Sequence, residues 1–139
     1  MTTKREQILQ AIKAKLTAIP GMISVERTRE DALTRSESPS AVITWSGERK
    51  KPVSYGVVDK LLSVHVAYYT RGAVPDQVAD QYIEAGHALL LADKTLGGLT
   101  LDLSEDRTDV ETDESDLPTG WIVVTYIAWY RHQEANLAA

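Results

Sequence analysis

Apolar residues at helical spacing predict two helices in this chain. The first is expected over 3–18, where Thr3 and Glu6 have the spacing of a capping box and Pro20-Gly21 follows the pattern. The second is expected over about 75–92, because Pro75 suits a first helical turn and Gly86 would permit close approach to a sheet. Both patterns are amphipathic, so each helix should bury one side against other elements.

Alternating apolar and polar positions predict strands in the remaining segments, over 22–29, 40–45, 57–69, 99–104 and 121–130, with a short strand around 108–112 left open. Ile23 and Val25 are expected to point inward. The order is α–β–β–β–α–β–(β)–β. It predicts one α+β domain over residues 1–139, a mostly antiparallel sheet of four to six strands with two helices packed on one face.

Two segments are expected to be irregular. Residues 46–56, SGERKKPVSYG, contain Gly, Pro and three consecutive cations, which is typical of a mobile basic loop. Such a loop is either a hairpin tip in water or an arm that orders on a partner. Residues 133–139 form a short tail that is expected to fray.

The run WIVVTYIAWY at Trp121–Tyr130 is apolar on both faces of its predicted strand. The helices can cover only one of these faces. In a chain of 139 residues the second cover is expected to come from another subunit.

The distribution of charge is uneven. Residues 1–60 hold 11 Lys/Arg and 7 Asp/Glu, whereas residues 61–139 hold 4 and 13. This bias fits head-to-tail pairing between copies, or two solvated surfaces of a monomer. A net charge of −5 disfavours general nucleic-acid binding. The chain has neither a long apolar run nor a cysteine, so we expect no membrane span and no disulfide. We expect synthesis in the cytoplasm.

Candidate catalytic chemistry is sparse. The three histidines, His65, His87 and His132, form no metal-binding motif, and no nucleophile elbow or phosphate loop occurs. The acidic segment 105–116 has three open interpretations: a solvated loop, a docking surface for a basic patch, or a Ca²⁺ or Mg²⁺ site without EF-hand spacing. We therefore predict no cofactor and no catalytic residue.

Four stretches resemble the phage tail terminator family, also described as tail completion or minor tail protein U-like proteins. They are REQILQAIKAKLTAIPG, VERTRE, VHVAYYTRGAVPDQVAD and TLGGLTLDLSEDRTDVETDESD followed by a strand ending WYR. The resemblance implies a non-enzymatic virion or prophage protein, made in the bacterial cytoplasm. It implies a ring, usually a hexamer, that caps the head-proximal end of the tail tube, ends its polymerisation and contacts the head–tail connector.

A closed ring needs two different complementary patches on each subunit. We hypothesise a basic patch, an acidic patch and an apolar strand face: Arg27, Arg29, Arg49, Lys50 and Lys51; Asp109, Glu111, Asp113, Glu114 and Asp116; Trp121 and Trp129. Two rivals stay open. One is a head–tail joining or neck protein, and the other is a small enzyme or metal-binding domain that uses the acidic segment.

Overall fold

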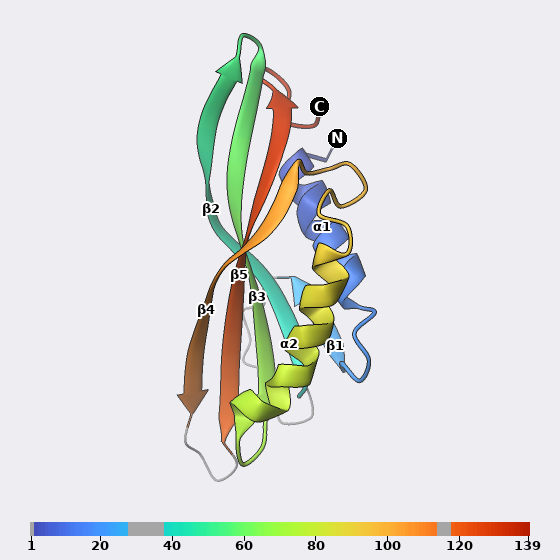
Figure 1. Ribbon diagram of the computed structural model, residues 1–139, viewed down its shortest axis with the longest axis vertical. Coiled ribbons are helices and arrows are strands. Elements are labelled where there is room, and N and C mark those ends of the chain that lie inside the picture. The colour runs from blue at the N-terminus through green and yellow to red at the C-terminus, as the bar shows by residue number, and fades with distance from the viewer. Residues whose placement is uncertain (1, 28–37, 114–117) are drawn as a thin grey trace.

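A five-stranded sheet with two helices on one face makes up the domain in the computed structural model (Figure 1). The structure describes residues 2–27, 38–113 and 118–139, with 112–113 described by their backbone alone. The elements follow the predicted order: α1 Lys4–Leu16, β1 Ser24–Arg27, β2 Ser40–Ser54, β3 Val57–Arg71, α2 Pro75–Leu91, β4 Asp102–Asp113 and β5 Thr119–Gln133. The predicted α+β class and the mostly antiparallel sheet are confirmed.

The strands lie in the order β1-β2-β3-β5-β4. Only β1 and β2 are parallel, and every other neighbouring pair is antiparallel. The long strands β2, β3 and β5 continue beyond the helices, and the β2–β3 hairpin projects from one end of the molecule (Figure 1). The sheet is strongly twisted, as expected for long strands.

The core lies between the helices and the inner face, the sheet face that bears both helices. Its members are fully or almost fully buried apolar side chains from α1, α2 and four strands, including Ile8, Ile12, Leu16, Leu62, Val64, Tyr68, Leu90, Leu103 and Tyr126. The predicted close approach at Gly86 is confirmed, because a methyl group there would collide with the Tyr68 hydroxyl. Sheet contact therefore requires glycine at this turn of α2.

Both helices start where the sequence predicts, but only α1 has a side-chain cap. Thr3 is the N-cap of α1, and its side chain accepts a hydrogen bond from the Glu6 N–H at 3.2 Å. Pro75 occupies the first turn of α2. Only half of the capping box forms, because the Glu6 carboxylate binds Arg27 of β1 instead.

The predicted irregular backbone over 46–56 is wrong as far as Ser54, although the interpretation of this segment as the tip of a hairpin is confirmed. Strand β2 continues to Ser54, and its register with β3 runs from Gly47↔Ser63 to Ser54↔Val57 with two irregularities. This part of the hairpin lies beyond the helices, so water reaches both of its faces and the apolar alternation that marks a half-buried strand is lost. Only Tyr55 and Gly56 form the turn.

The acidic segment is also a strand as far as Asp113. Here β4 runs without interruption over Asp102–Asp113, apart from a register shift between Glu105 and Arg107. It is the outermost strand on this side of the sheet, and charged side chains are typical of such an edge. The solvated-loop interpretation therefore fails over 105–113, while residues 114–116 lie outside the described residues.

Two smaller predictions also fail. Ile23 is 57% exposed because β1 begins only at Ser24, after the predicted inward position. The C-terminal tail makes defined contacts, with the Lys4 N–H donating to the Leu137 carbonyl at 2.8 Å and a bridge joining Gln133 to Asn136. In the described part of the chain, no helix is long and apolar enough to cross a membrane.

Candidate interaction surface

The second face of the sheet, called the outer face here, is covered by no helix or strand of the described residues. Alternation from the buried inner positions assigns to it two central rows of side chains: Leu61, Ser63, His65, Ala67 and Tyr69 of β3, and Trp121, Val123, Thr125, Ile127 and Trp129 of β5. These residues pair across the two strands, from Leu61↔Trp129 to Tyr69↔Trp121. Most of them stay partly exposed, so the final strand does have an apolar second face, as its sequence predicts.

Trp129 is held in place by a buried carboxylate. Asp59 is fully buried and accepts hydrogen bonds from the Trp129 indole N–H at 2.8 Å and from the Arg131 guanidinium at 2.7 and 3.2 Å. The Lys51 ammonium lies 5.6 Å from the centroid of the Trp129 ring. The hydrogen bonds from Arg131 are the main reason that the pKa of Asp59 lies below its ordinary value, with Trp129 adding to the effect. This network fixes an aromatic plane at the hairpin end of the outer face.

Trp121 marks the opposite end of the same face. Its ring lies 5.0 Å from that of Tyr69, centroid to centroid, in a tilted arrangement. Tyr69 is only 5% exposed, whereas Trp121 is partly exposed. Two tryptophans are thus presented along one face, each braced by a neighbour in the same chain.

An acidic strand borders the Trp121 end. Asp109 and Glu111 pair with Val123 and Trp121, which places both carboxylates on the outer-face side of β4. Arg107 pairs with Thr125 and forms an exposed ion pair with Asp109 at 2.7 Å. Between this edge and the central strands lies a hollow of about 530 Å³, whose wall includes His65, hydrogen-bonded through Nδ1 to the Thr125 hydroxyl at 2.8 Å.

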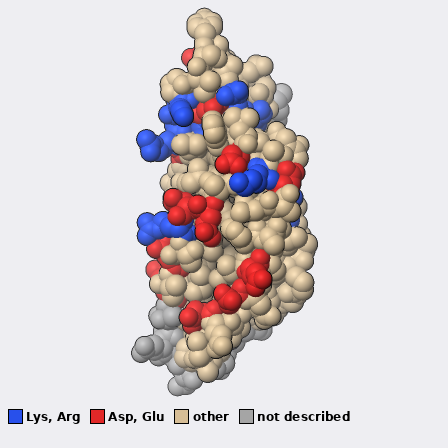
Figure 2. Space-filling model, viewed as in Figure 1, with Lys and Arg blue, Asp and Glu red and all other residues tan. Residues whose placement is uncertain are grey.

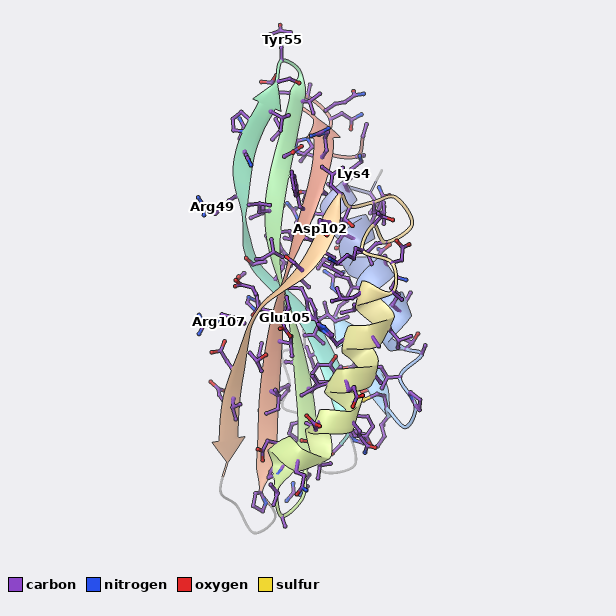
Figure 3. The ribbon with its side chains drawn as sticks, viewed as in Figure 1. Lys4, Arg49, Tyr55, Asp102, Glu105 and Arg107 are labelled. Atoms are coloured by element: carbon purple, nitrogen blue, oxygen red, sulfur yellow. The ribbon has the colours of Figure 1, made fainter. Side chains whose placement is uncertain are left out.

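A basic strand borders the Trp129 end. Arg49 pairs with Leu61 and Lys51 with Asp59, so both cations share the outer-face side of β2. Lys50 lies on the opposite side, and all three are exposed. In the space-filling view, cations gather towards the hairpin end and carboxylates over the middle and the other half (Figure 2). The labelled Arg49 and Arg107 both point outward from the same side of the molecule (Figure 3).

The structure brings together only part of the predicted set. Arg49, Lys51, Asp109, Glu111, Trp121 and Trp129 share the outer face or its borders, while Lys50 faces the other way. Arg27 is used within the chain, because its guanidinium binds the Glu6 carboxylate at 2.7 and 3.2 Å and lowers the pKa of Glu6. Arg29, Glu114 and Asp116 lie outside the described residues, and Asp113 is placed in β4 by its backbone alone.

Sequence reasoning missed four contributors to this surface: Tyr55, Asp59, Arg107 and Arg131. The sequence could have marked Tyr55, because an aromatic residue just before Gly56 in a turn segment is expected to be exposed. No local pattern in the sequence could have marked Asp59 and Arg131, because their pairing depends on the register of β3 with β5. Arg107 was not predicted as an interface residue, because it is a single cation among many carboxylates.

The described residues give little support to reaction chemistry. Among them, no group of three or more His, Asp or Glu side chains is placed to hold a metal ion. His87 contacts the Tyr126 hydroxyl at 3.0 Å and lies 3.9 Å from a Glu105 carboxylate oxygen, which is a packing role beside the core. No model of a known protein family matches the chain, and no curated protein sequence matches it.

Proposed function

We propose that the chain is a structural subunit of a phage or prophage tail that assembles with copies of itself into a ring on the head-proximal end of the tail tube. In this proposal the ring ends tube polymerisation and gives the surface to which the head connector binds. The resemblance to tail terminator proteins supplies the biological setting. The physical support comes from the surface described above.

The observation that carries the proposal is the outer face of the sheet, with its two partly exposed tryptophans, its basic border at β2 and its acidic border at β4. Trp121 and Trp129 are both held in place on a face that no described helix or strand covers, and aromatic residues are enriched at protein interfaces. Borders of opposite sign favour contact between different parts of two copies over contact between like parts. Such a heterologous contact is the type from which closed rings are built.

The charged side chains on the inner face also support a role for the outer face as the interface. At the base of the hairpin, Glu48 accepts hydrogen bonds from the Tyr130 hydroxyl at 2.7 Å and from Arg5 of α1 at 2.8 Å. Lys60 lies 3.6 Å from the same carboxylate, and the Arg5 guanidinium lies 4.6 Å from the Trp45 ring centroid. The charges of Glu48, Arg5 and Lys60 are therefore paired within the chain, which favours the outer face as the surface for a partner.

The test is sedimentation of the wild-type protein over a concentration series at low and high salt, with negative-stain imaging of the heaviest species. The proposal expects a discrete oligomer, visible as a ring and weakened by salt. A monomer at every concentration and salt would contradict it. Binding to purified tails that lack heads supports the tail position, whereas binding only to filled heads would assign the ring to the neck.

A further inference from the structure

The tip of the β2–β3 hairpin carries apolar surface that the fold does not use. Tyr55 is completely exposed, Val53 is 46% exposed, and Gly56 takes a positive φ of 82° to close the turn. Figure 3 shows Tyr55 at the extreme end of the molecule, pointing away from it. A tyrosine in this position offers a large, rigid contact area with one hydroxyl at its end.

The hollow on the outer face has the chemistry to receive such a tip. Its volume of about 530 Å³ lies within the usual range for binding pockets of roughly 300–1,000 Å³. Val123 gives it an apolar wall and is partly exposed. Asp109 and Glu111 supply carboxylates in the same wall, so both an aromatic ring and its hydroxyl have suitable partners.

The two surfaces are too far apart to meet within one chain. His65, the hollow residue nearest the tip along β3, lies eight residues beyond Val57, which corresponds to roughly 26 Å of strand. The contact therefore requires a second molecule.

Charge decides which second molecule fits. The strand that leads to the tip carries Arg49, Lys50 and Lys51, and its one carboxylate, Glu48, is already bound to Arg5 and Tyr130. The wall of the hollow holds two carboxylates, Asp109 and Glu111, and one cation, Arg107, which is paired with Asp109. Its balance is therefore negative, and β4 around it is acidic. Tip against tip and hollow against hollow would each bring like charges together, whereas tip against hollow pairs opposite charges.

We propose that the Tyr55 tip of one copy inserts into the outer-face hollow of the next copy, with Arg49, Lys50 and Lys51 approaching the acidic strand β4. This inference rests on the proposed ring and names the contact that links its neighbouring subunits. Because tip and hollow are different surfaces, each subunit gives one and receives one, as a closed ring requires.

Disulfide trapping tests the contact directly, since the chain contains no cysteine of its own. The variant Ser54→Cys/Val123→Cys keeps Tyr55 and places one cysteine beside the tip and one in the hollow. It cannot close a disulfide within one chain, because that bond needs Cα atoms within about 7 Å. Oxidation of the assembled protein should give a ladder of covalent multimers on a non-reducing gel, up to the number of subunits in the ring. The matched control Ser54→Cys/Asp80→Cys, with its second cysteine on the exposed side of α2, should give only traces.

Sedimentation of single variants gives a second readout that does not depend on thiol chemistry. Tyr55→Ala should raise the dissociation constant of the assembly by roughly 10- to 100-fold, as for an aromatic anchor, while Tyr55→Phe should retain most of the affinity. The unfolding midpoint of both variants should equal that of the wild type, because the side chain is fully exposed.

The outcomes separate the two proposals. Rings from the wild type, with no ladder from Ser54→Cys/Val123→Cys and no effect of Tyr55→Ala, overturn the tip contact and leave the ring in place. A wild type that stays monomeric at every concentration overturns both.

Discussion

The two faces of β5 differ in what covers them, although both are apolar in sequence. On the inner face, Ile122, Val124, Tyr126, Ala128 and Tyr130 are at most 4% exposed beneath the helices. On the outer face Trp121, Val123, Ile127 and Trp129 stay partly exposed, and only Thr125 is fully covered by its neighbours in the sheet. One strand therefore serves the fold with one half of its side chains, and the other half forms the surface that we propose for a partner.

The largest expected effect is on the free energy of unfolding, and it should differ between two adjacent leucines of β3. Leu62 faces the core and is fully buried, whereas Leu61 lies on the outer face and is partly exposed. Leu62→Ala should lower the free energy of unfolding by about 2–5 kcal/mol, because it removes packed side-chain atoms and leaves a cavity. Leu61→Ala should cost less than about 1 kcal/mol but weaken the assembly. Urea unfolding and sedimentation of both variants make the comparison, and equal losses of stability would mean that the faces do not differ.

The next effect concerns the carboxylate that braces Trp129. Asp59→Asn should lower the free energy of unfolding at pH 7 by about 1–3 kcal/mol, since it weakens buried hydrogen bonds to Arg131 and Trp129. It should also weaken assembly by releasing Trp129 from its position on the outer face. Unfolding of wild type and variant is measured in urea at pH 7.

The pH dependence of this pair has a defined sign. The pKa of Asp59 is lowered in the folded protein, so its contribution is complete above the ordinary value of 3.8 and is lost as the pH falls through the folded value. The wild type should therefore lose its advantage over Asp59→Asn only in acid, below about pH 4. An advantage that declines between pH 7 and pH 5 would show that another group is responsible.

The smallest effect on stability is expected from two neighbouring lysines of the hairpin. Lys51 lies on the outer-face side, over Trp129, and Lys50 lies on the opposite side. Lys50→Glu should change the free energy of unfolding by no more than about 0.5 kcal/mol, because the side chain is exposed. Lys51→Glu should lower it by no more than about 1 kcal/mol, because the new carboxylate lies opposite Asp59. Lys51→Glu should weaken assembly more than Lys50→Glu in low salt, and the difference should fade at high salt. Equal sedimentation of the two variants would remove the outer-face side of β2 from the interface.

Features that depend on interactions between residues close in sequence could be predicted, and features that depend on distant residues could not. Helical spacing and the Thr3 cap are local, and so are the alternating faces of β3 and β5, so these were predicted. The strand over 46–54 was missed because both of its faces meet water, and the continuity of β4 was missed because an acidic edge strand has a loop's composition. The pairing of Arg27 with Glu6, and of Asp59 with Arg131, joins residues far apart in sequence and follows only from the sheet order.

The most direct measurement of the central claim is sedimentation of Val123→Glu beside the wild type. Val123 lies in the middle of β5 on the outer face and is partly exposed, so a carboxylate there stays hydrated in the monomer but would be buried in an assembly. The account predicts an oligomeric wild type and a monomeric, folded Val123→Glu. The unfolding midpoint of the variant should be slightly lower, because Asp109 lies directly opposite this position. A variant that sediments as the same oligomer as the wild type would show that the outer face does not take part in assembly.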